Sequence, residues 1–214
     1  MAIPVLIIGR SGAGKTYSLK NFKPDEVGVI SVEKGRLPFR SEIKTTRIPK
    51  FDSAEHSAAQ ISAAKYAWIE QVISKAKVPS LVIDDSQYLL VNELFDRANE
   101  KGYDKFISMA ANFRNLIHFI NDLPEDDKII YFLHHSEADT DGREKVKTIG
   151  KMLDEKLTVE GCFDIVIYCQ DHKFFTQSNG QSTAKTPEDM FDLEIPNDLK
   201  MVDQTIREYY GLKK

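Results

Sequence analysis

Gly9-Arg10-Ser11-Gly12-Ala13-Gly14-Lys15-Thr16 is the stretch of sequence that indicates the fold. An apolar run, residues 3–8, precedes it, and a short segment ending before Pro24 follows it, so the order predicts a strand, a glycine-rich turn and a helix. Glycines let successive backbone N–H groups point at one anion, and the helix adds its positive N-terminal end. The stretch is therefore predicted to be a phosphate-binding loop. We expect a nucleotide to contact Gly9, Arg10, Ser11, Gly12, Ala13, Gly14, Lys15, Thr16 and Tyr17.

Side chains of the loop and two acids further along are expected to form a catalytic centre for ATP and Mg²⁺. Lys15 would reach the β- and γ-phosphates, and the hydroxyl of Thr16 would ligate Mg²⁺. The apolar run 80–83 ends in Asp84, which is the expected second metal ligand. Asp85 follows it and is a candidate catalytic base, although an aspartate reaches less far than a glutamate.

Polar residues also end two other predicted strands. Residues 27–32 form an apolar run that ends at Glu33, and residues 128–133 form another that ends at His134 and His135. In an open α/β sheet, ligands lie at the carboxyl ends of the strands. Glu33 is thus a candidate for the base that deprotonates the attacking water, with a solvated loop carboxylate as the alternative. His134, and after it His135, could sense the γ-phosphate, with a structural histidine as the alternative.

Length and composition indicate one folded domain, residues 1–214. The hydrophobic fraction is 42% and the charged fraction 29%, which favours a packed core over disorder. No apolar run approaches the ~20 residues that span a bilayer. No basic region precedes the first apolar run, so we expect no secretory signal and a cytoplasmic location. Cys162 and Cys169 flank an apolar run and are expected to be reduced and buried.

The charge distribution limits how the chain could bind nucleic acid. A net charge of −4 excludes a protein that coats nucleic acid over its whole surface, so contact with a polyanion would need a local patch. Residues 34–50 carry six basic residues against one acid. They predict a basic loop with an edge strand at 45–48. This loop is either a solvated surface or a contact for a nucleic-acid backbone or a neighbouring subunit.

The rest of the chain alternates predicted helices, strands and polar segments. Residues 136–148 are polar, contain an Asp-Gly turn, and predict a mobile functional loop. Helical periodicity or composition predicts helices at 15–22, 53–77, 86–100, 104–121, 149–157 and 198–210. Strands at 164–169 and 173–177 predict a hairpin.

This order of motifs resembles that of the RecA-like ATPases. More narrowly, the chain looks like the phage-encoded AAA-type nucleotide-binding proteins grouped with recombinase-like single-strand annealing proteins. The resemblance rests on the complete phosphate loop, on Val32-Glu33, and on the tail segments Ala184-Lys185-Thr186-Pro187 and Ile195-Pro196-Asn197-Asp198-Leu199. It implies an α/β RecA-like P-loop NTPase fold, with a central, mostly parallel sheet flanked by helices and a C-terminal β-hairpin.

The resemblance also implies roles for single residues. Glu33 matches the catalytic glutamate at the end of the second strand, which ranks it above Asp85. His134 matches the polar residue that couples the nucleotide state to a DNA-contacting loop, here residues 136–148. Lys185, with Lys173 as an outside candidate, matches a basic residue that acts on the γ-phosphate of a neighbouring subunit. The implied partners are single-stranded DNA and further copies of the chain in a ring or filament, acting in a host cytoplasm if the protein is phage-encoded.

Other functions remain open at this stage. A nucleotide-gated module with slow ATP turnover could use the basic segment 34–50 to bind a protein partner, and an aspartate at position 85 fits that reading. A small-molecule kinase is less well supported, since the late strands show no arginine-rich lid. A GTPase is weaker still, because the sequence contains no Asn-Lys-x-Asp motif to read guanine.

Overall fold

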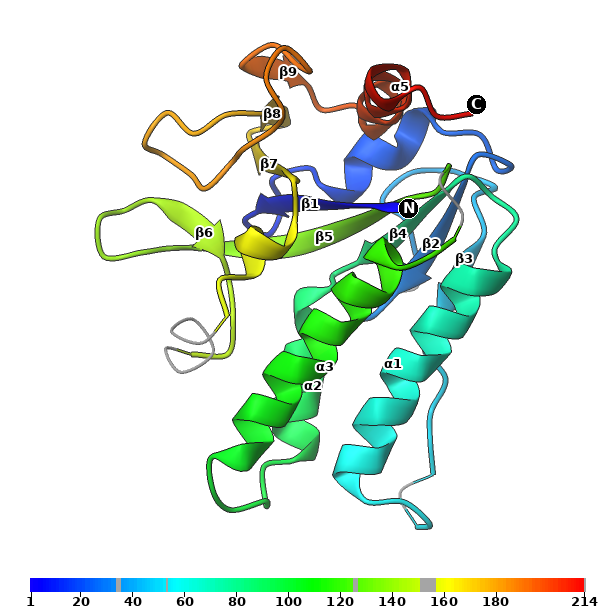
Figure 1. Cartoon of the computed structure of the whole chain (residues 1–214), viewed down its shortest axis with the longest axis vertical. Helices are drawn as coiled ribbons and strands as arrows, with labels where there is room; N and C mark the ends of the chain where they lie inside the picture. Colours follow the sequence, from blue (N-terminus) through cyan, green and yellow to red (C-terminus); the bar gives the residue numbers. More distant parts are fainter. Residues whose placement is uncertain (34–35, 53, 125–126, 151–156, 214) are drawn as a thin grey trace.

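A nine-stranded sheet lies at the centre of the computed structural model, which describes residues 1–33, 36–52, 54–124, 127–150 and 157–213. Its strands are β1 (Ile3–Gly9), β2 (Val27–Ser31), β3 (Thr45–Arg47), β4 (Ser80–Asp84), β5 (Ile129–Ala138), β6 (Glu144–Val146), β7 (Ile165–Gln170), β8 (Lys173–Phe175) and β9 (Glu194–Pro196). The order is β3–β2–β4–β5–β1–β7–β8–β9, of which the first six are parallel and the last two antiparallel (Figure 1). β6 pairs with the end of β5. This is the predicted arrangement of a mostly parallel sheet.

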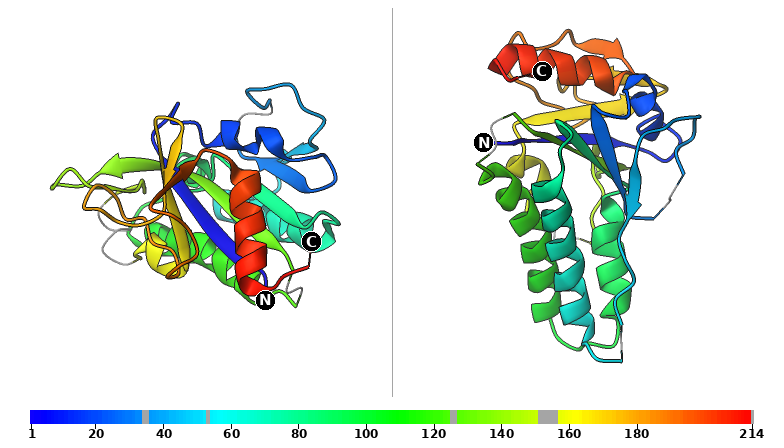
Figure 2. Two further views of the ribbon diagram at one scale, coloured as in Figure 1. Left: turned by 90° about the horizontal axis from the view of Figure 1, so that it is seen from above. Right: turned by 90° about the vertical axis from the view of Figure 1, so that its right-hand side faces the viewer.

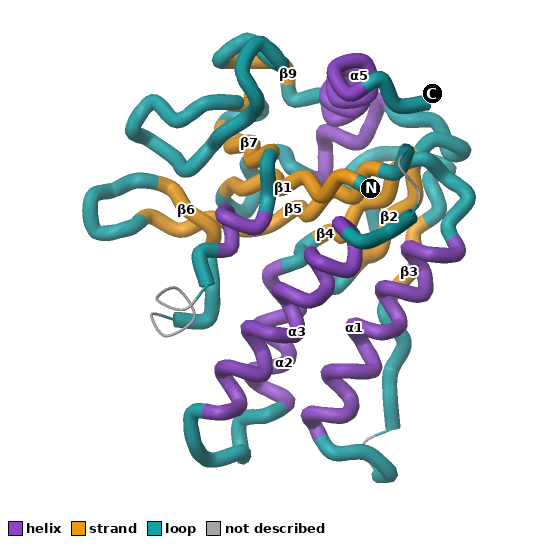
Figure 3. The backbone as a smooth tube through the Cα atoms, viewed as in Figure 1, coloured by secondary structure: helices purple, strands orange, loops and turns teal. Residues whose placement is uncertain are grey.

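Helices cover both faces of the sheet. They are the α-helices α1 (Ala58–Lys75), α2 (Gln87–Asp96), α3 (Asp104–Asn121) and α5 (Leu199–Tyr210), and the 3₁₀ helices η1 (Thr16–Asn21) and η2 (Val159–Cys162). α1, α2 and α3 lie together on one face, while η1 and α5 contact each other on the other face (Figure 2). Figure 3 shows the strands as an orange layer between these purple helices. Within the described residues, no helix combines the length and the apolarity needed to cross a bilayer.

The strand that carries the glycine-rich loop packs against both helical layers. In β1, Leu6 and Ile8 belong to the apolar cluster beneath α1–α3, and Val5 and Ile7 belong to the cluster beneath α5. All four side chains are fully buried. A continuous apolar run is what a parallel strand covered on both faces requires. This burial fixes the position from which the loop leaves the sheet.

The described α-helices lie where the sequence predicts them, but the predicted start of α1 and the predicted end of α2 are wrong, since α2 ends at Asp96 rather than at about residue 100. α3 and α5 match the expected spans, and Asp198 caps α5. The predicted start of α1 is wrong by several residues, because the helix begins after Ser57, which forms a reciprocal capping box with Gln60. Asp52 lies further upstream, where its carboxylate accepts the N–H of Ala54 (2.8 Å) in a turn before the helix.

The polar segment 136–148 forms a β-hairpin rather than the predicted loop. β5 runs on past the histidines and pairs antiparallel with β6. A carboxylate oxygen of Asp139 accepts the N–H groups of Asp141 (2.9 Å) and Arg143 (2.8 Å), and Gly142 has φ 80°. The Asp-Gly turn that suggested a loop therefore marks the tip of a hairpin.

In the C-terminal half, further elements differ from those that the sequence predicts. The helix predicted at 149–157 falls largely on residues 151–156, which lie outside the described part of the chain. β9 was not predicted, because it is three residues long and ends in a proline. Both cysteines are free thiols, of which Cys169 is buried and Cys162 is partly exposed.

A buried ion pair attaches α5 to the start of β4. Nε of Arg207 donates to Asp203 (2.7 Å), and both side chains are almost fully buried. Asp203 also accepts the hydroxyls of Ser80 and Tyr131, and Arg207 donates to the carbonyl of Pro79 (3.0 Å). Removing one partner of such a pair leaves an uncompensated buried charge.

Arg207→Met should lower the free energy of unfolding by about 3–5 kcal/mol, because Asp203 then stays buried without its cation. Urea unfolding measures this change. Lys173→Met is the matched control, since Lys173 pairs with Glu194 on the surface, and its cost should stay below about 1 kcal/mol. Equal losses in the two variants would contradict the role of the buried pair.

Candidate active site

The polar ends of neighbouring strands meet at one edge of the sheet. In the register of β1 and β5, Gly9 lies beside His135. In the register of β2 and β4, Ser31 lies beside Asp84. Because parallel strands end at a common edge, the glycine-rich loop, the acid after β4 and the histidines of β5 come together there.

Lys15 lies against the inner side of the loop. Its Nζ donates to the carbonyl oxygens of Gly9 (2.6 Å) and Arg10 (3.1 Å), and the residue is 6% exposed. An ammonium in this position would form charge-assisted hydrogen bonds with the oxygens of a phosphate bound in the loop. Lys15 thus lies inside the glycine-rich loop, and its contact with a phosphate stays a prediction.

Thr16 and Asp84, the two residues predicted to hold a metal ion, contact each other. The hydroxyl of Thr16 donates to Oδ1 of Asp84 (2.9 Å). Burial raises the pKa of Asp84 to about 6, and the charge of Asp85 contributes in the same direction. Hydroxyl and carboxylate oxygens suit Mg²⁺, and a bound cation would favour the ionised form that burial opposes. Among the described residues, no three acids, histidines or cysteines cluster to hold an ion alone, so other ligands would be phosphates and water.

A cavity of about 300 Å³ lies at the loop. It is lined by Ser11, Gly12, Gly14, Lys15, Thr16, Tyr17, Arg36, Pro38, Asp84, Asp85, His135 and His172. Asp85 has φ 59°, and its Oδ1 lies 3.3 Å from Nε2 of His135. Arg36 and His172 were not predicted as site residues. Arg36 lies in the basic segment 34–50, and His172 follows the end of β7, so the sequence pointed to both only weakly.

Residues from the C-terminal part of the chain hold the loop in place. Asn197 donates to the carbonyl of Gly14 (3.0 Å), and the N–H of His172 donates to that of Ala13 (3.1 Å). Gly14 has φ 109°, and a Cβ there would lie 2.4 Å from Asn197 and 2.7 Å from His172. Only glycine therefore fits at position 14, between Asn197 and His172. The thiol of Cys169 also supports the loop, because it donates to the carbonyl of Ala13 (3.3 Å), and burial raises the pKa of this thiol to about 12.

Arg10 connects the loop to the hairpin of β5 and β6. Its Nε and Nη2 lie 2.7 Å and 2.5 Å from one carboxylate oxygen of Glu144. Glu144 is buried, and its other oxygen accepts the hydroxyl of Ser136 (2.5 Å). The hydrogen bond with Glu144 raises the pKa of Arg10. Glu144 was not predicted as a site residue, yet its ion pair with Arg10 joins the glycine-rich loop to the β5–β6 hairpin.

His134 is a buried link rather than part of the cavity wall. Its Nε2 lies 2.8 Å from the carbonyl of Lys147, and its Nδ1 lies 3.0 Å from the hydroxyl of Ser86. A carbonyl can only accept, so Nε2 carries the proton, and the unprotonated Nδ1 faces the Ser86 hydroxyl, whose one proton it shares with the carbonyl of Leu133 (3.1 Å). Burial lowers the pKa of His134 to about 4, so the ring is neutral at pH 7. His135, the second candidate, is the histidine that lines the cavity.

Besides His134, two more predicted site residues, Glu33 and Lys185, lie outside the cavity lining. Glu33 has an exposed carboxylate that accepts a hydrogen bond from Asn92 of α2 (2.6 Å). Lys185 pairs through its backbone with Val166 of β7, which lies beside Leu6 of β1 and so upstream of the loop. Any action of Lys185 on a nucleotide would therefore require a neighbouring subunit.

Comparisons with known proteins give one family match. The family model described as AAA domain matches residues 1–192. The comparison with curated proteins gives no match. Among solved structures, a prototypical ATPase from the type III secretion system of pathogenic bacteria shows 12% identity and a TM-score of 0.41, over 78% of this chain and 50% of that chain. The chain thus spans half the length of that ATPase.

His134→Gln should weaken the dependence of stability on pH, because glutamine keeps a donor and an acceptor but does not titrate. The folded pKa of His134, about 4, lies below the ordinary value of 6.5. The unfolded chain therefore binds a proton first, and stability is lost as pH falls from 6.5 towards 4. The difference between the two values, 6.5 − 4, corresponds to about 3 kcal/mol.

Urea unfolding at pH 7 and at about pH 4.5 measures this effect in the parent and the variant. Most of the expected difference in the free energy of unfolding between parent and variant should be present at about pH 4.5. His56→Gln is the control, since His56 is exposed, and it should keep the parent's pH dependence. An unchanged pH dependence in His134→Gln would contradict the buried neutral ring.

Proposed function

The chain belongs to the AAA-domain family, and from this premise we propose that it is an ATPase that acts on single-stranded DNA in recombination or strand annealing. The observation that carries the ATPase part is the Thr16–Asp84 hydrogen bond, because it assembles a metal-binding pair at the phosphate loop. The resemblance of the motif order to recombinase-like annealing proteins supports the DNA part.

In the proposed reaction, the chain's own residues position the triphosphate and the water. Lys15 neutralises charge on the transferred phosphoryl group, and Thr16 and Asp84 would hold Mg²⁺, which would supply further positive charge to the phosphates. Glu33 orients and deprotonates the water that attacks the γ-phosphate in line. Lys185 of a neighbouring subunit in a ring or filament adds positive charge to the same group.

The hydrogen bond from Asn92 to Glu33 must break before Glu33 can act as this base. Its carboxylate accepts from Asn92, and it does not line the cavity at the loop. Asp85 does line the cavity, but its side chain is shorter and faces His135. Hydrolysis through Glu33 therefore depends on a rearrangement, whereas hydrolysis through Asp85 would not.

Two features support a polyanion as the partner. Lys44, Arg47 and Lys50 are exposed on or beside the edge strand β3, which supplies the local basic patch that a chain of net charge −4 needs. The hairpin of β5 and β6 is linked to the loop by Arg10 and Glu144. A nucleotide that moves the loop would therefore also move the hairpin, the proposed second DNA contact.

A nucleotide-gated protein-interaction module is the second candidate. The position of Glu33 outside the cavity lining, and an aspartate at position 85, favour slow turnover. In that case the exposed basic residues of β3 would bind an acidic protein surface when ATP is present.

Glu33→Gln should bind ATP as the parent does but hydrolyse it at least about 100-fold more slowly, because an amide does not take a proton from water. Nucleotide titration and steady-state ATPase rates measure the two effects. Lys15→Ala, which should lose binding or turnover, shows the background rate. Glu42→Gln is the matched control on the basic segment and should turn over normally.

Normal turnover in Glu33→Gln would remove Glu33 as the base. If Asp85→Asn is then inactive while it still binds ATP, the base is Asp85. If neither substitution slows hydrolysis, the water is activated by neither carboxylate, and the proposed reaction is wrong.

Single-stranded DNA should raise the ATPase rate several-fold at low salt, and the binding should weaken steeply as salt rises, because basic side chains release counterions from the phosphates. Duplex DNA of the same sequence is the control. If neither DNA changes turnover, the chain is an ATPase without the proposed DNA function. A protein partner captured only with ATP, alongside negligible turnover, would favour the interaction module.

A further inference from the structure

The residues that line the cavity at the glycine-rich loop come from both sides of the strand that carries the loop. The sheet order β4–β5–β1–β7–β8 places β1 between β5 and β7. Asp84 and His135 belong to β4 and β5, on one side of β1, whereas His172 belongs to the turn between β7 and β8, on the other. All three line the cavity. A triphosphate held by the loop would therefore have the acids on one side and the His172 turn on the other.

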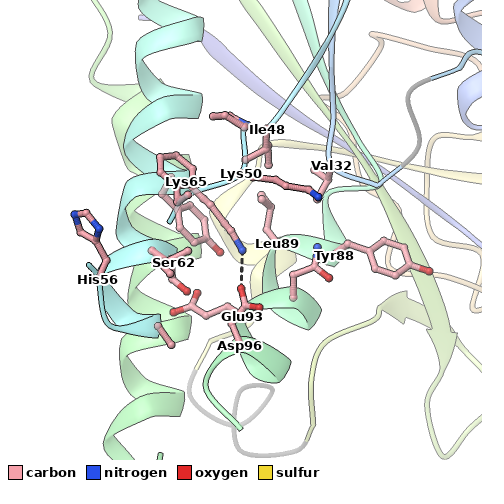
Figure 4. Close-up of a pocket in the computed structure, with 16 residues that line it drawn as sticks. Val32, Ile48, Lys50, His56, Ser62, Lys65, Tyr88, Leu89, Glu93 and Asp96 are labelled. Carbon is pink, nitrogen blue, oxygen red and sulfur yellow. Dashed lines mark hydrogen bonds and ion pairs between the residues drawn. The ribbon is translucent and has the colours of Figure 1, made fainter. Parts of the chain in front are cut away.

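On the side of β4 and β5, the nearest aromatic ring does not belong to this cavity. The ring of Tyr88 lies edge to face with His135, with centroids 5.9 Å apart. Tyr88 lines a different cavity, of about 520 Å³, between α1 and α2. Figure 4 shows its ring directed away from Ser62 and Glu93 in that cavity. Since Tyr88 is not part of the lining at the loop, its ring is not available to a nucleotide held there.

On the side of β7 and β8, two aromatic rings form a corner in the lining of the loop cavity. Tyr17 and His172 both line it, and their rings lie at 90° to each other with centroids 5.6 Å apart. Tyr17 is 37% exposed, and His172 is exposed as well. Each ring thus keeps a surface that no protein atom covers. Flat aromatic faces of this kind bind nucleic-acid bases by stacking.

Neighbouring side chains fix the ring of Tyr17 in the free protein. Phe39 lies edge to face with it, with centroids 6.2 Å apart and an angle of 86° between the rings. Nζ of Lys20 lies 4.5 Å from the centroid of Tyr17 and donates to its hydroxyl (3.3 Å). A side chain that is already held in place loses little freedom when a ligand packs on it. The ring of Tyr17 is therefore preorganised as a binding surface.

The backbone at His172 is in a conformation that does not favour a side chain. Asp171 and His172 form the two-residue turn between β7 and β8, with φ of 49° and 58°. Such turns prefer glycine, because the left-handed region is costly for most other residues. The N–H of His172 donates to the carbonyl of Ala13 (3.1 Å), which fixes the turn against the loop. Backbone strain of this kind is typical of ligand sites, so it is a second observation that points to a role for the ring.

We propose that the base of the bound nucleoside triphosphate stacks in the corner between Tyr17 and His172, while the phosphates extend from the loop towards Asp84. The inference rests on the proposed function, because it requires a nucleotide in the loop. It adds a contact that the loop alone does not supply, one that distinguishes a nucleotide from an inorganic polyphosphate. Stacking uses the faces of a base, so the corner sets the requirement for a base and not the choice among bases.

The test compares the binding of ATP with that of inorganic tripolyphosphate, each with Mg²⁺, by isothermal titration calorimetry. Tripolyphosphate has the three phosphates but neither ribose nor base. Tyr17→Leu removes the flat ring and keeps apolar bulk. His172→Asn removes the other ring and introduces a residue that also accepts a positive φ. Each substitution should weaken the binding of ATP at least about fivefold and leave that of tripolyphosphate unchanged.

Two matched controls follow from the position of the rings. Tyr88→Leu removes an aromatic ring on the other side of the loop, and Asp171→Asn changes the same turn without removing a ring. Both variants should keep the parent's ratio of the two affinities. Unchanged binding of tripolyphosphate in the Tyr17 and His172 variants also shows that these variants are folded and that their loop is intact.

An ATP affinity that stays at the parent's value in either Tyr17→Leu or His172→Asn would overturn the proposal. So would equal losses of ATP and tripolyphosphate, because the two residues would then only hold the loop in shape. Ribose 5-triphosphate, which has the sugar but no base, should behave like tripolyphosphate. If its affinity falls with that of ATP, the rings contact the sugar and the proposal is wrong.

The parent protein separates this inference from the proposed function. If the parent binds neither ATP nor tripolyphosphate, the proposed ATPase fails, and the base contact fails with it. If the parent binds both and hydrolyses ATP, but the two ring variants behave like the parent, the base contact alone is wrong and the ATPase stands.

Discussion

The hydrogen bond between the hydroxyl of Thr16 and the carboxylate of Asp84 is the contact on which the site depends. It joins the loop after β1 to the end of β4, although these strands are not neighbours, because β5 lies between them. The loop must therefore reach across the end of β5. This places His135, near the end of β5, in the same cavity as Lys15 and Asp84, and it brings Arg10 of the loop against Glu144 of the hairpin.

The C-terminal part of the chain supports this contact from two directions. Asn197 and His172 hold the back of the loop, so that only glycine fits at position 14. At the other end of β4, Ser80 bonds to Asp203, which is paired with Arg207. β4 is thus tied at its first residue to α5 and at its last residue to the loop. A change in α5 would therefore shift Asp84 through β4, without a direct contact between them.

The sequence could predict those parts of the site that depend on local pattern. Glycine spacing identified the loop, and apolar runs that end in polar residues identified Asp84 and His135, which the structure brings to one cavity. It could not identify Glu144 or Asn92, because each matters through a partner more than fifty residues away, Arg10 and Glu33. The hairpin at 136–148 was read as a loop for a related reason. Its strands are polar, and their pairing is only visible once β5 is placed.

The two carboxylates that could activate water differ in a way that bears on regulation. Asp85 already lines the cavity and is held near His135, so hydrolysis through it would proceed whenever ATP is bound. Glu33 is held by the amide of Asn92, so hydrolysis through it would first require that hydrogen bond to break. An ATPase stimulated by a strand and a module with slow turnover are then not opposed readings of the chain. They would be the behaviours of one chain when the Asn92–Glu33 hydrogen bond is broken and when it is kept.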